Sequence, residues 1–139
     1  MGILIDSDVI IDVLTNRKPF SEHSKEVLIS CENGRVKGFI TPIILANAYY
    51  LLCKSNSEHK VRKQLFELIE FLDVLPMDKQ IIIKAFLSVF KDFEDSLQNY
   101  AAELSSDVDF IVTRNVRDYK QSALDILSPS ELVGILNSR

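Results

Sequence analysis

Short apolar runs alternate with longer amphipathic stretches along the whole of this chain. The short runs predict five strands, at residues 2–5, 36–40, 73–76, 108–112 and 124–127, the first of them buried. In the stretches between them apolar residues recur at helical spacing, as Val61, Leu65 and Leu68 do. Because each parallel crossover needs a helix to carry the chain back, strands that alternate with helices predict a parallel sheet covered on both faces.

Polar residues mark where the predicted helices begin. These starts are expected at Ser21, at Thr41 with Pro42 in the first turn, near Ser57, at Asp78, at Asp92 and at Ser128. The helix that starts at Asp78 is expected to reach Phe90, and Glu131 completes a capping box with Ser128. We therefore predict an α/β fold, a three-layer α/β/α sandwich with a central parallel sheet of about five strands, formed by a single domain over residues 1–139.

The composition is that of an ordinary globular protein. Hydrophobic residues make up 47% and charged residues 26% of the 139 residues, with four Gly and four Pro, which excludes collagen-like, disordered and disulfide-scaffold classes. No apolar stretch approaches the roughly 20 residues of a membrane span. Cys31 and Cys53 form no CxxC or zinc motif, so a reduced, cytoplasmic protein without a membrane partner is expected. The net charge of -4 argues against binding nucleic acid by broad electrostatic attraction alone.

The predicted topology brings polar side chains to one edge of the sheet. Helices that follow parallel strands begin at the carboxyl edge, where ligands usually bind. Four separate stretches place there Asp6, Asp8, Asn47, Asp92, Glu94, Asp95, Thr113, Asn115 and Asp118. Crowded carboxylates repel one another and are costly to bury unless a hard cation shares the site, so Mg²⁺ or Mn²⁺ is the expected cofactor. Such an ion activates water and neutralises phosphoryl charge, which favours phosphodiester hydrolysis.

Some of these residues also have structural explanations. Asp92 is a good helix N-cap, and Asp95 stands where a capping box puts its acid. Asn115 and Asp118 are typical loop and turn residues. An acid directly after a buried strand contributes little to structure, so Asp6 favours a functional role.

Four segments together resemble the PIN-domain family, which includes the VapC-type toxin ribonucleases of bacterial toxin–antitoxin pairs. They are residues 3–11 (ILIDSDVII), residues 39–43 (FITPI) leading to Asn47, residues 92–98 (DFEDSLQ) with Ala101 and Ala102, and residues 111–119 (IVTRNVRDY). The resemblance spans nearly the whole chain in the expected order. It implies a PIN-like fold and a Mg²⁺- or Mn²⁺-dependent endoribonuclease, the toxin of a toxin–antitoxin pair, that hydrolyses RNA.

The resemblance also assigns roles to individual residues. Its catalytic set is Asp6, Asn47, Asp95 and Asp118, its metal ligands are Asp6, Asp95, Asn115 and Asp118, and its supporting residues are Asp8, Asp92, Glu94 and Thr113. Asp8 stands where the family usually has Asn, and Asn115 stands where many members carry a fourth acid, which Asp118 would supply. The departure with most effect is Asn47, because the family usually has Glu there. An amide oxygen coordinates a metal without charge, so Glu94 or Asp92 would compensate.

The resemblance further implies partners. Arg114, Arg117 and Lys120 follow the fourth strand and are expected to contact RNA phosphates. An antitoxin protein is an expected partner, and a homodimer is expected because PIN-type proteins commonly pair.

Two other functions fit parts of the sequence. A PIN-like module with weakened catalysis, which binds RNA or protein, is favoured by Asn47, Asn115 and the acidic net charge. The segment Asp6-Ser-Asp-Val9 also resembles the nucleophile motif of haloacid-dehalogenase-type phosphatases, for which Lys91 and Asp92 are weak candidates as the further residues required.

Overall fold

The structure, a computed structural model, describes residues 1–138. In chain order its elements are β1 (Gly2–Ile5), α1 (Ser7–Leu14), α2 (Ser21–Glu32), β2 (Lys37–Ile40), α3 (Pro42–Leu52), α4 (Glu58–Ile69), β3 (Asp73–Val74), α5 (Lys79–Phe86), α6 (Phe93–Glu103), β4 (Phe110–Val112), the 3₁₀ helix η1 (Val116–Tyr119), β5 (Asp125–Leu127) and α7 (Pro129–Asn137).

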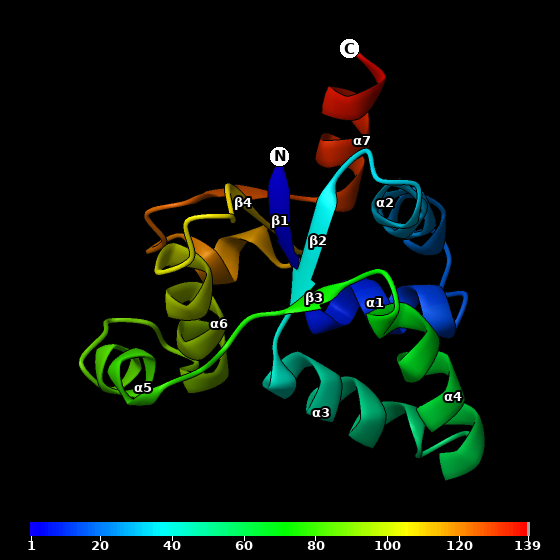
Figure 1. Ribbon diagram of the computed structural model, residues 1–139, viewed down its shortest axis with the longest axis horizontal. Coiled ribbons are helices and arrows are strands. Elements are labelled where there is room, and N and C mark those ends of the chain that lie inside the picture. The colour runs from blue at the N-terminus through cyan, green and yellow to red at the C-terminus, as the bar shows by residue number, and fades with distance from the viewer. Residues whose placement is uncertain (139) are drawn as a thin grey trace.

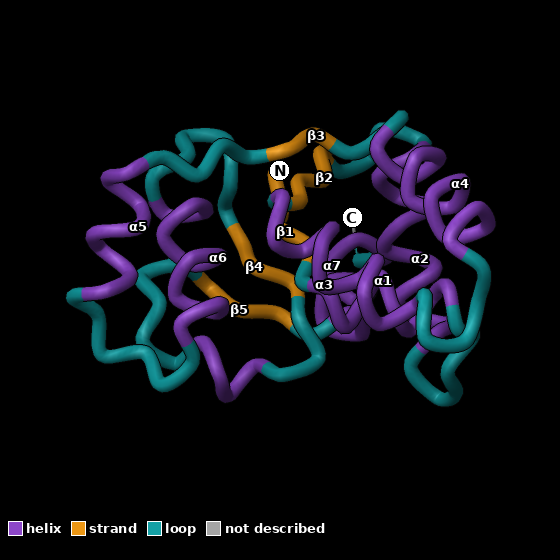
Figure 2. Tube along the Cα trace, turned by 90° about the horizontal axis from the view of Figure 1, so that it is seen from below, coloured by secondary structure: helices purple, strands orange, loops and turns teal. Residues whose placement is uncertain are grey.

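The five strands form one parallel sheet in the order β3-β2-β1-β4-β5, with β1 at its centre (Figure 1). Gly2 of β1 pairs with Lys37 of β2, and Ile5 of β1 pairs with Val112 of β4. Figure 2 shows α5 and α6 on one side of the sheet and α1, α2, α3 and α7 on the other. The predicted three-layer α/β/α architecture is therefore confirmed.

Most of the predicted helix starts carry a side-chain cap. The side chains of Thr41, Ser57, Asp78, Asp92 and Ser128 each accept a hydrogen bond from a backbone N–H in the first turn, and Glu131 completes the capping box at Ser128. The exception is α2. Its N-cap is Phe20, and the hydroxyl of Ser21 donates to Oδ1 of Asn16 instead. These caps satisfy backbone N–H groups that have no partner inside the helix.

Close packing of β2 against the surrounding layers depends on Gly38. A Cβ atom at this position would lie 2.5 Å from Cδ2 of Leu72 and 2.7 Å from Sγ of Cys31. Both neighbours are buried in the hydrophobic core. Only glycine therefore fits here without a shift of the core.

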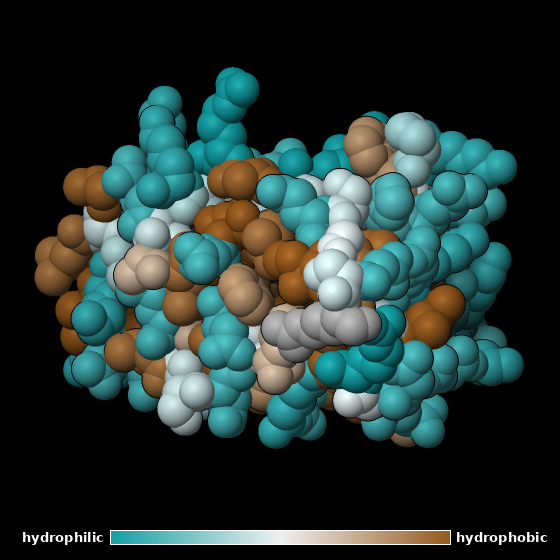
Figure 3. Space-filling model, turned by 90° about the horizontal axis from the view of Figure 1, so that it is seen from above, coloured by the Kyte–Doolittle hydropathy of each residue, from teal (hydrophilic) through white to brown (hydrophobic). Residues whose placement is uncertain are grey.

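Helix α5 ends at Phe86, four residues before its predicted end. The hydroxyl of Ser88 donates to the carbonyl oxygen of Ala85 over 2.8 Å and so satisfies a group at the helix end. The apolar periodicity continues past this stop, which is why the sequence predicts a longer helix. Ile82, Ile83, Phe86 and Leu87 stay exposed, and Figure 3 shows apolar side chains at the left of the molecule, over α5. No helix within residues 1–138 is long and apolar enough to cross a membrane.

Candidate active site

Three neighbouring strands each lead at the carboxyl edge into a polar residue. Asp6 follows β1, Thr41 follows β2 and Thr113 follows β4. Because Ile5 pairs with Val112, Asp6 and Thr113 lie side by side: the backbone N–H of Asp6 donates to the carbonyl oxygen of Val112 over 3.0 Å. The Thr113 hydroxyl lies 3.0 Å from Oδ2 of Asp6. The sheet register therefore fixes the distance between the first acid and this hydroxyl.

Asp6 is a buried carboxylate that three donors hold in place. Its Oδ1 accepts from the backbone N–H of Ser7 over 2.8 Å, which also caps α1. Its Oδ2 lies within hydrogen-bond distance of the hydroxyls of Thr113 and Tyr119, the latter at 3.2 Å. Burial raises the pKa of Asp6 above its ordinary value although these bonds lower it, and the charge of Asp118 adds to the increase. Asp6 is thus held rigidly in an environment that disfavours its negative charge.

Asp95, on the first turn of α6, contacts the same phenol as Asp6. Its Oδ1 lies 3.4 Å from the hydroxyl oxygen of Tyr119. Burial raises the pKa of Asp95 to about 7, with further contributions from the charges of Asp6, Asp92 and Asp118. Residues 89 positions apart in the chain are therefore brought to one spot, as the topology predicted.

Asp92, Asp95 and Asp118 line one cavity of about 360 Å³ together with Arg117 and Lys120. Asp92 also caps α6, since its Oδ1 accepts from the backbone N–H of Asp95 over 2.9 Å. The structural and functional explanations of Asp92 are therefore compatible. Carboxylates and basic side chains face the same space, which suits a phosphate-bearing ligand.

Asp8 forms a second polar cluster next to the first. Its Oδ2 accepts from the backbone N–H of Arg114 and from Nδ2 of Asn115 over 3.1 and 3.0 Å. It also lies 3.2 Å from the hydroxyl of Thr113, whose single proton Asp8 shares with Asp6. Its Oδ1 is buried and has no hydrogen-bond partner among residues 1–138. Burial and the charge of Asp6 raise the pKa of Asp8 to about 6. Asn115, predicted as a metal ligand, thus supports Asp8, with its side-chain nitrogen directed at the Asp8 carboxylate.

Arg114, predicted to contact RNA, is held by the protein itself. Its Nε and one terminal nitrogen donate to the two carboxylate oxygens of Asp12 over 2.7 and 3.2 Å. The side chain of Asp12 is 1% exposed and that of Arg114 is 25% exposed. The guanidinium carbon also lies 4.1 Å from the ring centroid of Phe20. Arg117 and Lys120, by contrast, are exposed.

Asn47 lies on α3 and pairs with Glu94 on α6. Nδ2 of Asn47 donates to Oε2 of Glu94 over 2.8 Å. Because α3 and α6 belong to opposite helical layers, this bond spans the carboxyl edge of the sheet (Figure 2). The predicted compensating acid is therefore in contact with the residue it would compensate.

Sequence reasoning missed two residues of this edge, Tyr119 and Asp12. The Tyr119 hydroxyl contacts both Asp6 and Asp95, yet the position after Asp118 reads only as an aromatic of the motif. Asp12 is an acid on the otherwise apolar buried side of α1, and that mismatch was the signal available. Its partner, Arg114, lies 102 positions away.

The residues at this edge fit an openly coordinated divalent cation. Among the described residues, no three His, Cys, Asp or Glu side chains lie close enough to enclose an ion by themselves. Mg²⁺ often binds through one or two carboxylates and keeps several waters, so Asp6 and Asp95 can suffice. The only two salt bridges within residues 1–138, Lys37–Asp73 and Arg114–Asp12, leave both carboxylates without a basic counter-charge. The buried, unpartnered Oδ1 of Asp8 is a further oxygen beside them.

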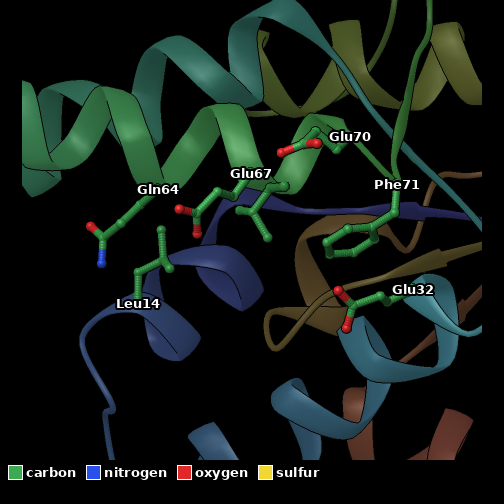
Figure 4. A pocket seen from close by; sticks show the side chains of 7 residues that line it. Leu14, Glu32, Gln64, Glu67, Glu70 and Phe71 are labelled. Carbon is green, nitrogen blue, oxygen red and sulfur yellow. The ribbon is translucent and has the colours of Figure 1, made fainter.

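A separate cavity of about 470 Å³ lies at the opposite end of α1 from Asp6. Leu14, Leu68 and Phe71 line it, together with Gln64, Glu32, Glu67 and Glu70 (Figure 4). Its residues come from the ends of α1 and α2, from α4 and from the two positions that follow α4. It shares no residue with the carboxyl edge and does not belong to the candidate site.

Comparison with known proteins gives a family and a fold. A family profile described as PIN domain matches residues 2–117. A comparison with curated proteins gave no match.

Three solved structures share the fold. VapBC2 from Rickettsia felis, solved bound to a DNA fragment from its promoter, is 14% identical, with a TM-score of 0.67 over 92% of this chain and 98% of that chain. VapBC-1 from nontypeable Haemophilus influenzae is 17% identical, with a TM-score of 0.69 over 94% and 99%. PAE2754 from Pyrobaculum aerophilum is 18% identical, with a TM-score of 0.64 over 100% and 91%. At these identities the likeness concerns the fold.

Proposed function

The chain belongs to the PIN domain family, and on that premise we propose that it is a Mg²⁺- or Mn²⁺-dependent endoribonuclease, the toxin of a toxin–antitoxin pair. The resemblance found in the sequence is thereby confirmed at the level of the family. The haloacid-dehalogenase alternative is set aside, because the match places the first acid in a different family of folds.

The observation that carries this proposal is the convergence of Asp6 and Asp95. Asp6, directly after β1, and Asp95, on α6, both lie within hydrogen-bond distance of the Tyr119 oxygen, and neither has a basic partner among the described residues. Burial raises the pKa of both groups, and the charge of Asp6 adds to the increase at Asp95, so a cation would stabilise the ionised pair. A cation bound there activates water and neutralises charge on the phosphoryl group.

The chain's own residues would divide the remaining work. Asp6 and Asp95 offer oxygens to the cation, and Asp118 adds negative charge beside both. Thr113 holds Asp6 and Asp8 in place through one hydroxyl. Arg117 and Lys120, exposed at the same cavity, would bind RNA phosphates and orient the scissile bond. Arg114 would contribute to this less, because Asp12 occupies it.

Asn47 and Glu94 would supply the remaining acid of the site as a pair. The amide of Asn47 holds the Glu94 carboxylate by its Oε2, and Oε1 of Glu94 makes no hydrogen bond within the described part of the chain. Of the predicted compensating acids, Glu94 contacts Asn47 directly, whereas Asp92 is engaged as the α6 cap. We assign Glu94 the compensating role.

The proposal includes partners and a setting. Two of the similar structures are VapBC assemblies, which supports an antitoxin protein as a partner of this chain. A homodimer and a cytoplasmic location complete the proposal, with the whole chain acting as one domain. The exposed apolar side chains at the end of α5, among them Phe86 and the C-cap residue Leu87, offer a surface for such pairing.

A second candidate is a PIN-like module that binds RNA or protein without cleaving it. It is favoured by the two amides, since Asn47 and Asn115 contribute no charge and both donate their side-chain nitrogen to a carboxylate. Calorimetry with Mn²⁺ separates the candidates. Measurable binding that Asp6→Asn removes supports the enzyme, and no binding by the wild type supports the module.

Cleavage of a structured, fluorescently labelled RNA pool in the presence of Mn²⁺ tests the enzyme directly. Asp95→Asn should lower the rate by at least about 100-fold, because a ligand to the ion is lost. Asp125→Asn is the matched control: it removes the same charge from an exposed residue at the start of β5, at the other edge of the sheet, and should leave the rate unchanged. Equal activity in wild type and Asp95→Asn would mean that the cleavage comes from a contaminant.

A further inference from the structure

The hydroxyl of Tyr119 lies within hydrogen-bond distance of both carboxylates that the proposed function requires. Its oxygen is 3.2 Å from Oδ2 of Asp6 and 3.4 Å from Oδ1 of Asp95. A hydroxyl has a single proton, so it donates to one carboxylate at a time while it touches both. Tyr119 is thus the one side chain, among residues 1–138, that hydrogen-bonds to both acids.

The position of this hydroxyl is set by the core and is independent of solvent. Tyr119 is 1% exposed and ends the 3₁₀ helix η1. Its ring packs edge-on against Phe90, with centroids 6.2 Å apart, and Phe90 packs in the same way against Tyr100. Because the ring of Tyr119 is held by this packing, its hydroxyl oxygen has a fixed position at the carboxyl edge of the sheet.

The two carboxylates depend on Tyr119 to different degrees. Asp6 keeps the backbone N–H of Ser7 and the hydroxyl of Thr113 as partners when the phenol is removed. The Asp95 carboxylate has no hydrogen-bond donor other than Tyr119 within the described part of the chain. Loss of the phenol oxygen would therefore free the Asp95 side chain to rotate and leave Asp6 in place.

From this geometry we propose that Tyr119 is a positioning residue, whose hydroxyl holds the Asp95 carboxylate at a fixed distance from Asp6 so that a divalent cation meets both. The inference rests on the proposed function, since it concerns the same pair of acids. Hydrogen-bond donors behind metal ligands commonly set ligand orientation, and their removal typically costs 10- to 100-fold in metal affinity.

Calorimetric titration with Mn²⁺ tests the role without any RNA. Tyr119→Phe keeps the buried ring and removes one oxygen, and it should bind Mn²⁺ about 10- to 100-fold more weakly than the wild type. The matched control is Tyr100→Phe, which removes a phenol oxygen from the same aromatic cluster but contacts neither acid, and should bind like the wild type. Equal or tighter Mn²⁺ binding by Tyr119→Phe would overturn the inference.

A second measurement works on the wild-type protein itself. The chain contains four Tyr and no Trp, and its eight Phe absorb at shorter wavelengths, so the long-wavelength part of its near-ultraviolet difference spectrum reports on tyrosine. Saturation with Mg²⁺, which does not absorb, should perturb this spectrum in wild type and in Tyr100→Phe, and the change should vanish in Tyr119→Phe. A wild type that binds Mg²⁺ with no tyrosine change would overturn the positioning role alone, whereas a wild type that binds neither Mg²⁺ nor Mn²⁺ would overturn the proposed function.

Discussion

Nδ2 of Asn47 lies 2.8 Å from Oε2 of Glu94, and this bond joins the two helical layers across the carboxyl edge of the sheet. A second polar contact between the same two helices joins the hydroxyl of Thr41, at the start of α3, to Oε1 of Gln98 on α6. The donors in both contacts are therefore neutral, and of the four residues that make them only Glu94 carries a charge.

Asn47→Glu should change metal affinity and stability in opposite directions. Two carboxylates would then stand where an amide meets an acid, so the metal-free protein should lose up to about 1 kcal/mol of stability, as for other partly exposed charge pairs. The added charge should strengthen Mn²⁺ binding in calorimetry. Asn47→Ala, which removes the amide without adding charge, is the control, and weaker binding by Asn47→Glu than by Asn47→Ala would contradict the prediction.

Arg114→Ala should destabilise the fold, because it leaves the carboxylate of Asp12 buried without its counter-ion. A buried pair that loses one partner typically costs 3–5 kcal/mol, and since a quarter of the Arg114 side chain is exposed we expect about 2–3 kcal/mol in urea unfolding. Arg117→Ala, at an exposed site, should change stability by less than about 0.5 kcal/mol but weaken RNA binding. Similar stabilities of the two variants would show that the Asp12 pair contributes little.

Metal-free protein should lose stability as pH rises from 5 to 8. The pKa of Asp8 is raised to about 6 and that of Asp95 to about 7, and the pKa of Asp6 is raised as well, mainly by burial. An acid with a raised pKa in the folded state binds its proton more tightly there than when unfolded. The stabilisation that comes from the raised pKa is therefore fully present below the pKa of the unfolded carboxyl, near 3.8. It is lost as the pH rises through the folded-state pKa values of about 6 and 7.

Thermal melts in EDTA at pH 5, 6, 7 and 8 measure this effect. Asp95→Asn should flatten the pH dependence, and Mg²⁺ should restore more stability at pH 8 than at pH 5 because it binds the ionised carboxylates. A wild-type Tm that rises between pH 5 and 8 in EDTA would contradict the assignment.

Two glycines should respond to alanine in opposite ways. Gly38→Ala forces a Cβ to within 2.5 Å of Leu72 and should destabilise the protein by about 1–3 kcal/mol. At Gly134, inside α7, a Cβ meets nothing within 4 Å, so Gly134→Ala should stabilise by about 0.5–1 kcal/mol. Urea unfolding of the two variants beside the wild type measures both changes, and a Gly38→Ala protein as stable as wild type would show that the core adapts.

The parts of the structure that follow from local rules were predictable. Strand and helix order came from apolar periodicity, and the parallel topology then carried Asp6 and Asp95 to the same edge. The helix caps at Thr41 and Ser128 follow from the chemistry of the N-cap.

What could not be predicted depends on packing between distant segments. The direction of the Tyr119 hydroxyl is set by Phe90, which lies in another part of the chain. The pairing of Arg114 with Asp12 joins the segment between β4 and η1 to helix α1. The sequence alone does not distinguish a basic residue that faces solvent from one that pairs with a buried acid. Likewise, the contact between Asn47 and Glu94 requires the relative positions of two helices on opposite layers.

One consequence follows from Asp6 being at once an acid of the edge and the N-cap of α1. Two constraints therefore act on the residue at position 6, catalysis and helix capping. A relative without catalytic activity would still need Asp, Asn, Ser or Thr there to start the helix. Asp95 caps nothing, because Asp92 starts α6. Among diverging relatives, an acid at position 6 is therefore weak evidence that catalysis is retained. An acid at position 95 is stronger evidence, because helix capping does not require it.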